Sequence, residues 1–328
     1  MMNDLIQKFT GQLKVDFKIE NFKQPNHPIY QILMAGMGGS GIGSSTVCDI
    51  VADDCTAPIV IVNGYKLPHF ISKNTLVVLS SYSGNTEETL ACMAQAMQTE
   101  ATIVCVTSGG KMLSTATDHG LPYILLPSGW PSPRACLGFS VNAQITALAH
   151  YGLISKSHIE QLRSAAELLI FEQEDIKLKA EKLANILVDR LPILYTTDRA
   201  ESVVLRWRQQ INENSKMLCS HNTIPEMNHN ELVGWKFKNE KIAVLFLRYK
   251  DDTKQNQLRI EFAKQTINKL VPTVVEIFAK GQTLTEKMFY LIHLGDWVSW
   301  YLSKLLNVDA SEIQVIDKLK EHLSNQRY

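Results

Sequence analysis

Short apolar runs alternate with helical segments along the first half of this chain, and this alternation restricts the fold more than any other feature of the sequence. The segments between the runs have helical character, as in residues 85–98. Alternation of this kind predicts a doubly wound α/β fold, in which helices cover both faces of a parallel sheet. The runs lie at residues 29–37, 58–63, 75–81, 101–108 and 122–127.

The second half repeats the alternation after a helical stretch at residues 137–190. A chain of 328 residues is long enough for two domains of ordinary size. We therefore expect two α/β domains, at 1–152 and 153–328. The second-half strands are expected at 192–197, 241–249 and 272–279, and closing helices at 283–306 and 311–323.

Composition excludes several classes of partner. The 33 basic and 33 acidic residues cancel, so the chain has no general attraction for nucleic acid or anionic membrane. Its apolar runs, such as residues 242–247, are too short to span a bilayer. The six cysteines are scattered without a C-x-x-C pair and are interpreted as free thiols. We expect a cytoplasmic protein with no nucleic-acid or membrane partner.

A glycine-rich turn follows the first predicted strand, in the stretch LMAGMGGSGIGSS at residues 33–45. Three of its glycines satisfy G-x-G-x-x-G, the pattern of dinucleotide sites. Such a site also needs an acidic residue at the end of the second strand. That strand ends instead at Asn63, and the acidic residues 53 and 54 precede it. A nicotinamide-linked oxidoreductase is therefore disfavoured. The three glycines are Gly36, Gly38 and Gly41.

A second polar turn, SSYSGNTEET at residues 80–89, follows the third strand and opens a helix. Backbone N–H groups at helix N-termini favour anions, and short hydroxyls add neutral donors. For one such turn alone, a capped helix start is the usual interpretation. Two turns after neighbouring parallel strands favour a site for one phosphate monoester, and no G-x-x-x-x-G-K-[ST] occurs. The expected ligands are Gly38, Gly39 and Ser40 in the first turn, and Ser81, Ser83 and Thr86 in the second.

Together the two turns resemble those of a sugar isomerase (SIS) domain. Later segments narrow the resemblance to the bifunctional phosphoglucose/phosphomannose isomerase family, and it covers nearly the whole chain. The resemblance implies two flavodoxin-like SIS domains in tandem, a homodimer, and no cofactor or metal. It also implies isomerisation of fructose 6-phosphate to glucose 6-phosphate and mannose 6-phosphate through an enediolate. The later segments are PSPRACLGFS (131–140), NENSK (212–216), PEMNHNELVGW (225–235) and the C-terminal stretch 295–320.

The same resemblance implies three catalytic residues. Glu213 would be the base that moves a proton between C1 and C2, a task that suits a carboxylate. His229 would be the ring-opening acid, donated across the dimer interface to the partner's site. Arg134 would stabilise the enediolate with a permanently charged guanidinium. Read without the family, these residues are a solvated helix carboxylate, a surface histidine and a surface arginine.

The C-terminal segment implies a further ring-opening lysine and leaves a choice between two. The family usually has D-P-T-P-V before this helix, whereas this chain has DASEI, which retains a hydroxyl at Ser311. On a helical repeat Ser311 and Lys318 share a face, while Lys320 is rotated by about 200° from Lys318. The spacing therefore favours Lys318 over Lys320.

Two other classes of protein remain as alternatives. A non-catalytic SIS sensor would need both phosphate turns but not Glu213, Arg134 or His229. A zinc-dependent mannose-phosphate isomerase would need a ligand cluster. His221, His229 and Glu231 lie near one another in the sequence but lack the spacing of a known zinc motif.

Overall fold

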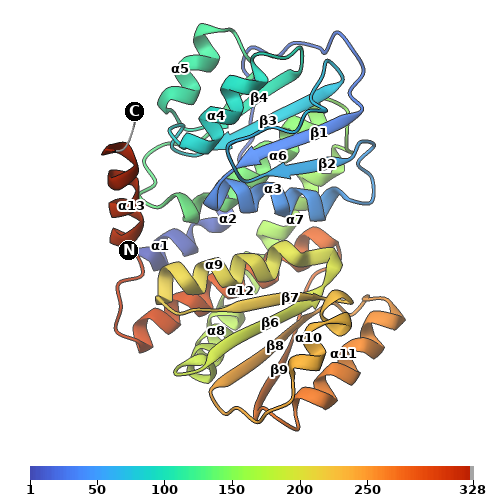
Figure 1. Cartoon of the computed structure of the whole chain (residues 1–328), viewed down its shortest axis with the longest axis vertical. Helices are drawn as coiled ribbons and strands as arrows, with labels where there is room; N and C mark the ends of the chain where they lie inside the picture. Colours follow the sequence, from blue (N-terminus) through green and yellow to red (C-terminus); the bar gives the residue numbers. More distant parts are fainter. Residues whose placement is uncertain (326–328) are drawn as a thin grey trace. The chain divides into compact units, whose positions relative to one another are not determined.

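The computed structural model describes residues 1–325 and contains two parallel sheets, of five and four strands (Figure 1). The contacts divide the chain into two compact units. The five-strand unit comprises Gln7–Phe171 and Lys280–Tyr290, and the four-strand unit comprises Met1–Ile6, Glu172–Ala279 and the chain from Leu291 onward. In this division residues 153–171 belong to the five-strand unit, where α7 (Ser157–Phe171) packs against other helices of that unit.

The strand order of the five-strand unit is β2-β1-β3-β4-β5, the flavodoxin-like order that the resemblance implies. All five predicted strands are confirmed, and neighbouring strands are parallel. The strands are β1 (Gln31–Gly36), β2 (Ile59–Val62), β3 (Thr75–Ser81), β4 (Thr102–Thr107) and β5 (Tyr123–Leu125). The helices are α2 (Phe9–Gln12), α3 (Gly38–Val51), α4 (Glu87–Ala96), α5 (Gly110–Asp118), α6 (Leu137–His150) and α7 (Ser157–Phe171), with a 3-10 helix, η1 (Pro133–Cys136).

Helices cover both faces of this sheet (Figure 1). Side chains alternate between the faces along each strand. Leu33 and Ala35 belong to a buried cluster with Met93 of α4 and Met112 of α5. The residues that alternate with them, such as Met34, point to the other face, where α3 and α6 pack against each other and against the strands. Burial on both faces explains why these strands read as nearly continuous apolar runs.

The four-strand unit repeats the same order, β7-β6-β8-β9, again with parallel neighbours. Its strands are β6 (Leu191–Thr197), β7 (Ser220–Ile224), β8 (Ile242–Arg248) and β9 (Thr273–Phe278). Its helices are α8 (Gln173–Leu187), α9 (Glu201–Ser215), α10 (Glu231–Gly234), α11 (Lys254–Ile267) and α13 (Gln314–Asn325), with 3-10 helices η2 (Asp198–Ala200) and η3 (Glu226–His229). Two helices, α1 (Met2–Gln7) and α12 (Leu284–Leu305), contribute to both units.

The sequence interpretation missed β7, whose sequence SHNTI carries four polar residues. β7 is an edge strand of the sheet, and only Thr223 and Ile224 are buried. An edge strand needs little apolar surface, so the hydrophobic pattern that predicted the other strands is absent here.

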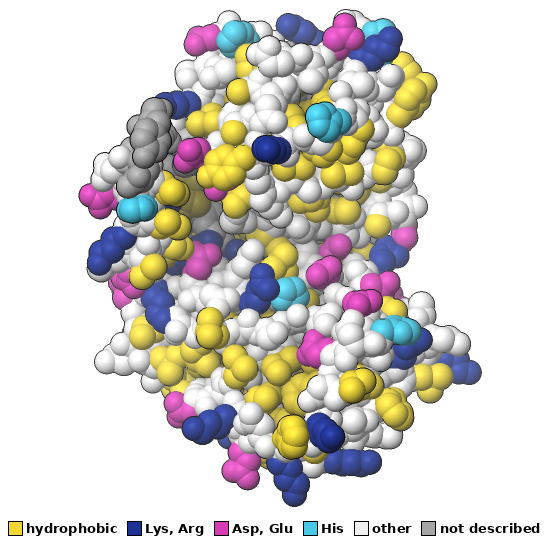
Figure 2. All heavy atoms as spheres, in the orientation of Figure 1, with side chains coloured by type: hydrophobic (Ala, Val, Ile, Leu, Met, Phe, Trp, Pro, Cys, Tyr) yellow, Lys and Arg dark blue, Asp and Glu magenta, His cyan; other side chains and the backbone are white. Residues whose placement is uncertain are grey.

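The surface has no large region of one charge on the face drawn in Figure 2, where lysine and arginine side chains are interspersed with aspartate and glutamate. This distribution agrees with the balanced composition. Within residues 1–325, none of the helices combines the length and the apolar character needed to cross a bilayer.

Candidate active site

The two phosphate turns predicted from the sequence meet at the carboxyl edge of the five-strand sheet. The first joins β1 to α3, and the second, Tyr82–Thr86, joins β3 to α4. The Ser40 hydroxyl accepts a hydrogen bond from the Tyr82 backbone N–H at 3.3 Å. Gly38 and Gly39 form the first turn of α3, where helix N–H groups lack partners within the helix. The predicted ligands of both turns therefore lie at one place in the fold.

The second turn is held by its own hydroxyl groups. Ser81 Oγ lies 2.8 Å from Thr86 Oγ1 and accepts a hydrogen bond from the Gly84 N–H at 3.1 Å. Ser83 Oγ accepts from the Asn85 N–H at 3.2 Å. Ser81 is buried, Thr86 is half-buried and Ser83 is exposed, so the three hydroxyls line the turn from the inside to the surface.

A third loop, between β4 and α5, braces the second turn and was missed by the sequence interpretation. Gly84 has a φ of +66°, and a Cβ there would lie 1.7 Å from the Gly109 carbonyl oxygen. Asn85 Oδ1 accepts a hydrogen bond from the Lys111 N–H at 3.0 Å. Ser108 Oγ donates to the Tyr82 carbonyl at 2.6 Å. The absence of a Cβ at Gly84, and likewise at Gly110, where a Cβ would lie 2.4 Å from the Ser83 carbonyl oxygen, lets the two backbones approach this closely.

Arg134 lies in η1, next to the first turn. A Cβ on Gly39 would lie 3.0 Å from the Pro133 carbonyl oxygen and 3.3 Å from the Arg134 Cα. The Arg134 side chain is buried, so the surface-arginine interpretation is wrong. Tyr82 fixes the segment before η1, because its hydroxyl donates to the Pro127 carbonyl at 2.9 Å and accepts from the Trp130 N–H at 3.1 Å.

A buried polar network underlies the same turns. Gln144 of α6 accepts a hydrogen bond from Ser44 Oγ at 2.9 Å and donates to Ser140 Oγ at 2.7 Å. Ser140 Oγ lies 3.5 Å from Ser80 Oγ at the end of β3. The network joins α3, α6 and β3 directly beneath the turns. Ser140 and Gln144 are polar residues within the apolar helix α6, and this contrast is the sequence signal that could have indicated them.

Glu213, His229, Ser311 and Lys318 belong to the four-strand unit. Glu213 lies in the last turn of α9 and is half-buried. The helix is fixed to α12 by a buried ion pair, Arg206 Nε to Asp296 Oδ1 at 3.0 Å, and by Asn214 Nδ2 donating to Ser299 Oγ at 2.9 Å. Gly295 packs against the Trp207 indole, where a Cβ would lie 2.3 Å from Nε1. The carboxylate therefore extends from a rigid helix end.

The end of α9 is tied to the segment before α13. Lys216 adopts a left-handed conformation with φ +58° and ends the helix. Its ammonium group donates to the Glu213 carbonyl at 2.6 Å and to the Glu312 carbonyl at 2.7 Å. Through Lys216 the segment that carries Ser311 contacts the helix that carries Glu213.

The expected start of the C-terminal helix is wrong. The helix α13 begins at Gln314, because Asp309 Oδ1 accepts from the Ser311 N–H at 2.8 Å and Glu312 caps the Gln314 N–H. Ser311 therefore precedes the helix, and the shared face that favoured Lys318 over Lys320 does not exist. Both lysines are exposed, and Lys320 contacts Asp317 at 3.4 Å.

Two histidines of the four-strand unit, His221 in β7 and His229 in η3, have different surroundings. Burial, followed by the nearby Arg208, lowers the pKa of His221 to about 4, so this ring is neutral at ordinary pH and unsuited to donate a proton. His229, in η3, is exposed to solvent. Among residues 1–325, no three His, Cys, Asp or Glu side chains group as metal ligands do.

The four-strand unit has a loop that corresponds to the second phosphate turn. Tyr249–Thr253 joins β8 to α11 and matches Tyr82–Thr86 in length and in its first and last residues. Asp252 occupies its interior, where Oδ1 accepts from Thr197 Oγ1 at 3.0 Å and Oδ2 from the Tyr249 N–H at 3.1 Å. The Asp252 carboxylate thus accepts hydrogen bonds from the donors at this edge of the four-strand sheet.

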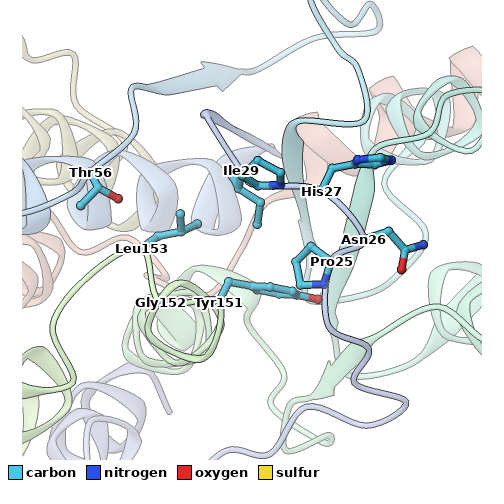
Figure 3. Close-up of a pocket in the computed structure, with 9 residues that line it drawn as sticks. Pro25, Asn26, His27, Ile29, Thr56, Tyr151, Gly152 and Leu153 are labelled. Atoms are coloured by element: carbon cyan, nitrogen blue, oxygen red, sulfur yellow. The ribbon is translucent and has the colours of Figure 1, made fainter.

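A hollow of about 420 Å³ lies elsewhere in the five-strand unit (Figure 3). Its lining comes from the segment before β1, from Thr56 before β2 and from the end of α6. These segments are at the amino ends of the strands, opposite the phosphate turns. In parallel α/β folds ligands bind at the carboxyl ends, so this hollow is not the candidate site.

Comparisons with known proteins identify relatives of this chain. A sequence model described as the bacterial phospho-glucose isomerase C-terminal SIS domain matches residues 176–323. The chain is 35% identical over 306 residues, 90% of each chain, to the bifunctional phosphoglucose/phosphomannose isomerase of Caldicellulosiruptor bescii. It is 26% identical, over 90% of each chain, to a D-glucosamine-6-phosphate 4-epimerase of Sulfolobus acidocaldarius.

Among solved structures, the fold is similar to that of the C-terminal domain of glucosamine-fructose-6-phosphate aminotransferase from Francisella tularensis. The TM-score is 0.72 at 11% identity, with 95% of this chain and 98% of that chain covered. At this identity the likeness concerns the fold alone, and it supports the SIS-type architecture.

Proposed function

This chain belongs to the bifunctional phosphoglucose/phosphomannose isomerase family, and on that premise we propose that it interconverts fructose 6-phosphate with glucose 6-phosphate and mannose 6-phosphate. The observation that supports the proposal most strongly is the meeting of the two turns through Ser40 and Tyr82, at the carboxyl edge of one sheet. Backbone N–H groups and short hydroxyls at that edge suit a single phosphate monoester.

Substrate binding and ring opening come first in the proposed reaction. Gly38, Gly39 and Ser40 of the first turn, with Ser81, Ser83 and Thr86 of the second, hold the phosphate. The ring C2–O5 bond of fructose 6-phosphate then breaks. His229 gives a proton to O5, and the anomeric hydroxyl releases its proton to water as the carbonyl forms. Ser311 and a lysine of α13, Lys318 or Lys320, assist this step.

Proton transfer follows in the open chain. The Glu213 carboxylate removes a proton from C1, and Arg134 stabilises the resulting enediolate. Return of the proton to C2, with transfer of a hydroxyl proton from O1 to O2, completes the aldose. Glucose 6-phosphate and mannose 6-phosphate differ only at C2, so reprotonation on either face of the enediolate gives both products.

Proton NMR of the purified protein with fructose 6-phosphate in ²H₂O tests the proposal directly. We expect signals of both aldoses, with deuterium at C2 where the proton on Glu213 exchanges with solvent before it is transferred to C2, and the same result with a metal chelator present. Glucose 6-phosphate alone would reject the second activity. Binding without any aldose signal would favour a sugar-phosphate sensor. A parallel sample with glucosamine 6-phosphate would reveal C4 epimerisation, the reaction named for the Sulfolobus relative.

Replacing Gly84 with alanine is expected to weaken binding of fructose 6-phosphate about 5- to 150-fold, because strain of about 1–3 kcal/mol must displace the second turn. The new Cβ would lie 1.7 Å from the Gly109 oxygen, in a left-handed conformation. Isothermal titration measures the affinity. Gly64→Ala is the matched control, since no atom lies within 4 Å of a Cβ there. Unchanged affinity in Gly84→Ala would remove this turn from the site.

A further inference from the structure

Both carboxylate oxygens of the half-buried Glu231 accept a hydrogen bond from a side chain of the adjacent sheet. One oxygen accepts a hydrogen bond from the Tyr195 hydroxyl, and the other accepts from Asn222 Nδ2 at 2.7 Å. Trp235 Nε1 donates to the same Tyr195 hydroxyl at 3.1 Å. These contacts connect α10 to β6 and β7.

Tyr195 is a buried residue whose hydroxyl donates the hydrogen bond to Glu231. Its ring has no exposed surface and packs against Phe246 of β8, with ring centroids 5.3 Å apart. Burial, and then the Glu231 carboxylate beside it, raise the pKa of Tyr195, so the hydroxyl keeps its proton. A charged acceptor with two neutral donors is among the stronger hydrogen-bond arrangements in proteins.

The Glu231 contacts fix the short segment that carries His229. Met227, two residues before His229, is fully buried in the same core as Tyr195. After His229, Asn230 caps the Glu231 N–H at 2.6 Å and donates to Glu226 Oε1 at 2.5 Å. The exposed histidine is thus held between two anchors, one apolar and one made by Glu231.

We propose that Glu231 is a positioning residue for ring opening, which holds His229 in place through its hydrogen bonds to Tyr195 and Asn222. The inference rests on the proposed function, because it assigns His229 the proton that goes to O5. Glu231 itself touches no reacting atom. Placement matters in this step, since a shift of about 1 Å in a catalytic group can cost about a hundredfold in rate.

Such a role affects one step of the reaction and spares the next. Fructose 6-phosphate is mostly a closed ring that must open before Glu213 can act. 5-Deoxyfructose 6-phosphate lacks the O5 hydroxyl that closes the furanose ring and stays open. If His229 is displaced, turnover of fructose 6-phosphate therefore slows, while turnover of 5-deoxyfructose 6-phosphate is unaffected.

The experiment compares kcat/KM for both substrates in Glu231→Ala, Tyr195→Phe and the control Glu240→Ala, which changes an exposed loop residue of the same unit. For Glu231→Ala we expect a loss of about 10- to 100-fold with fructose 6-phosphate and less than about threefold with the open-chain analogue. Tyr195→Phe should show the same difference between the two substrates with a smaller loss of kcat/KM, since the hydrogen bond from Asn222 still holds Glu231. The control should match the wild type.

Equal losses with the two substrates, or no loss with either, would overturn the positioning role. If Glu231→Ala does not fold, Tyr195→Phe alone decides, because it keeps the buried ring and removes one donor. Wild-type protein without turnover on either substrate would instead reject the proposed function. The two failures are therefore distinguishable.

Discussion

Replacing Glu213 with glutamine is expected to lower the isomerisation rate by about 10²- to 10⁴-fold, the usual contribution of a general acid–base group. Affinity for fructose 6-phosphate should stay within about threefold, because glutamine has the same size and Glu213 binds no phosphate in the proposed mechanism. Steady-state kinetics and isothermal titration measure the two quantities separately. Glu201→Gln, at the other end of α9, is the matched control and should retain wild-type turnover.

A protein whose turnover survives Glu213→Gln uses a different base, and the assignment fails. A protein with no turnover before the change is a sensor or acts on another substrate. The variant thus separates the proposed enzyme from its principal alternative.

The same variant tests the proposed homodimer when it is mixed with His229→Ala and allowed to exchange subunits. If each histidine serves the partner's site, half of the dimers are mixed and each regains one active site, which gives about a quarter of wild-type activity. If His229 serves its own chain, mixing restores nothing.

Replacing Asp296 with asparagine is expected to destabilise the four-strand unit by about 3–5 kcal/mol, because it removes the carboxylate charge that pairs with the buried Arg206 guanidinium. Both side chains are almost fully buried, and two hydrogen bonds join them, at 3.0 and 3.1 Å. The pair connects α9, which carries Glu213, to α12. It is the charged member of a set of buried contacts between these two helices, which includes the hydrogen bond from Asn214 to Ser299.

Urea unfolding, monitored by tryptophan fluorescence, measures the free energy of unfolding of the four-strand unit. Trp207, Trp235, Trp297 and Trp300 lie in the four-strand unit, and Trp130 lies in the other. Asp175→Asn, which removes a partly exposed ion pair with Lys179, is the control and should cost no more than about 1 kcal/mol. A similar small loss for Asp296→Asn would show that Arg206 is otherwise stabilised.

The sequence predicted the fold well where side chains are buried on both faces of a sheet. β1, β3 and β4 have this property, and the apolar runs placed all five strands of this sheet within a few residues. β7 was missed because an edge strand with mostly polar residues has no such pattern. The start of α13 was misplaced because Asp309 and Glu312 bind backbone N–H groups locally, which competes with helix formation at Ser311.

For the candidate site, the sequence indicated which residues could act but not what holds them. The turn hydroxyls and the glycines lie in contiguous motifs. The residues that support the candidate groups, such as Gln144, Asp296 and Tyr195, are far from their partners in the sequence, and no local motif marks them. Only the tertiary structure places them against Ser44, Arg206 and Glu231.

The single ammonium group of Lys216 has a consequence for sequence variation near the C-terminus. Because it donates hydrogen bonds to two carbonyl oxygens, it links the last turn of α9 to residues 309–313. A deletion or insertion between α12 and α13 would consequently pull on the Glu213 backbone, although it lies almost a hundred residues away along the chain. We therefore expect the number of residues between α12 and α13 to be constrained by the position that Glu213 must keep.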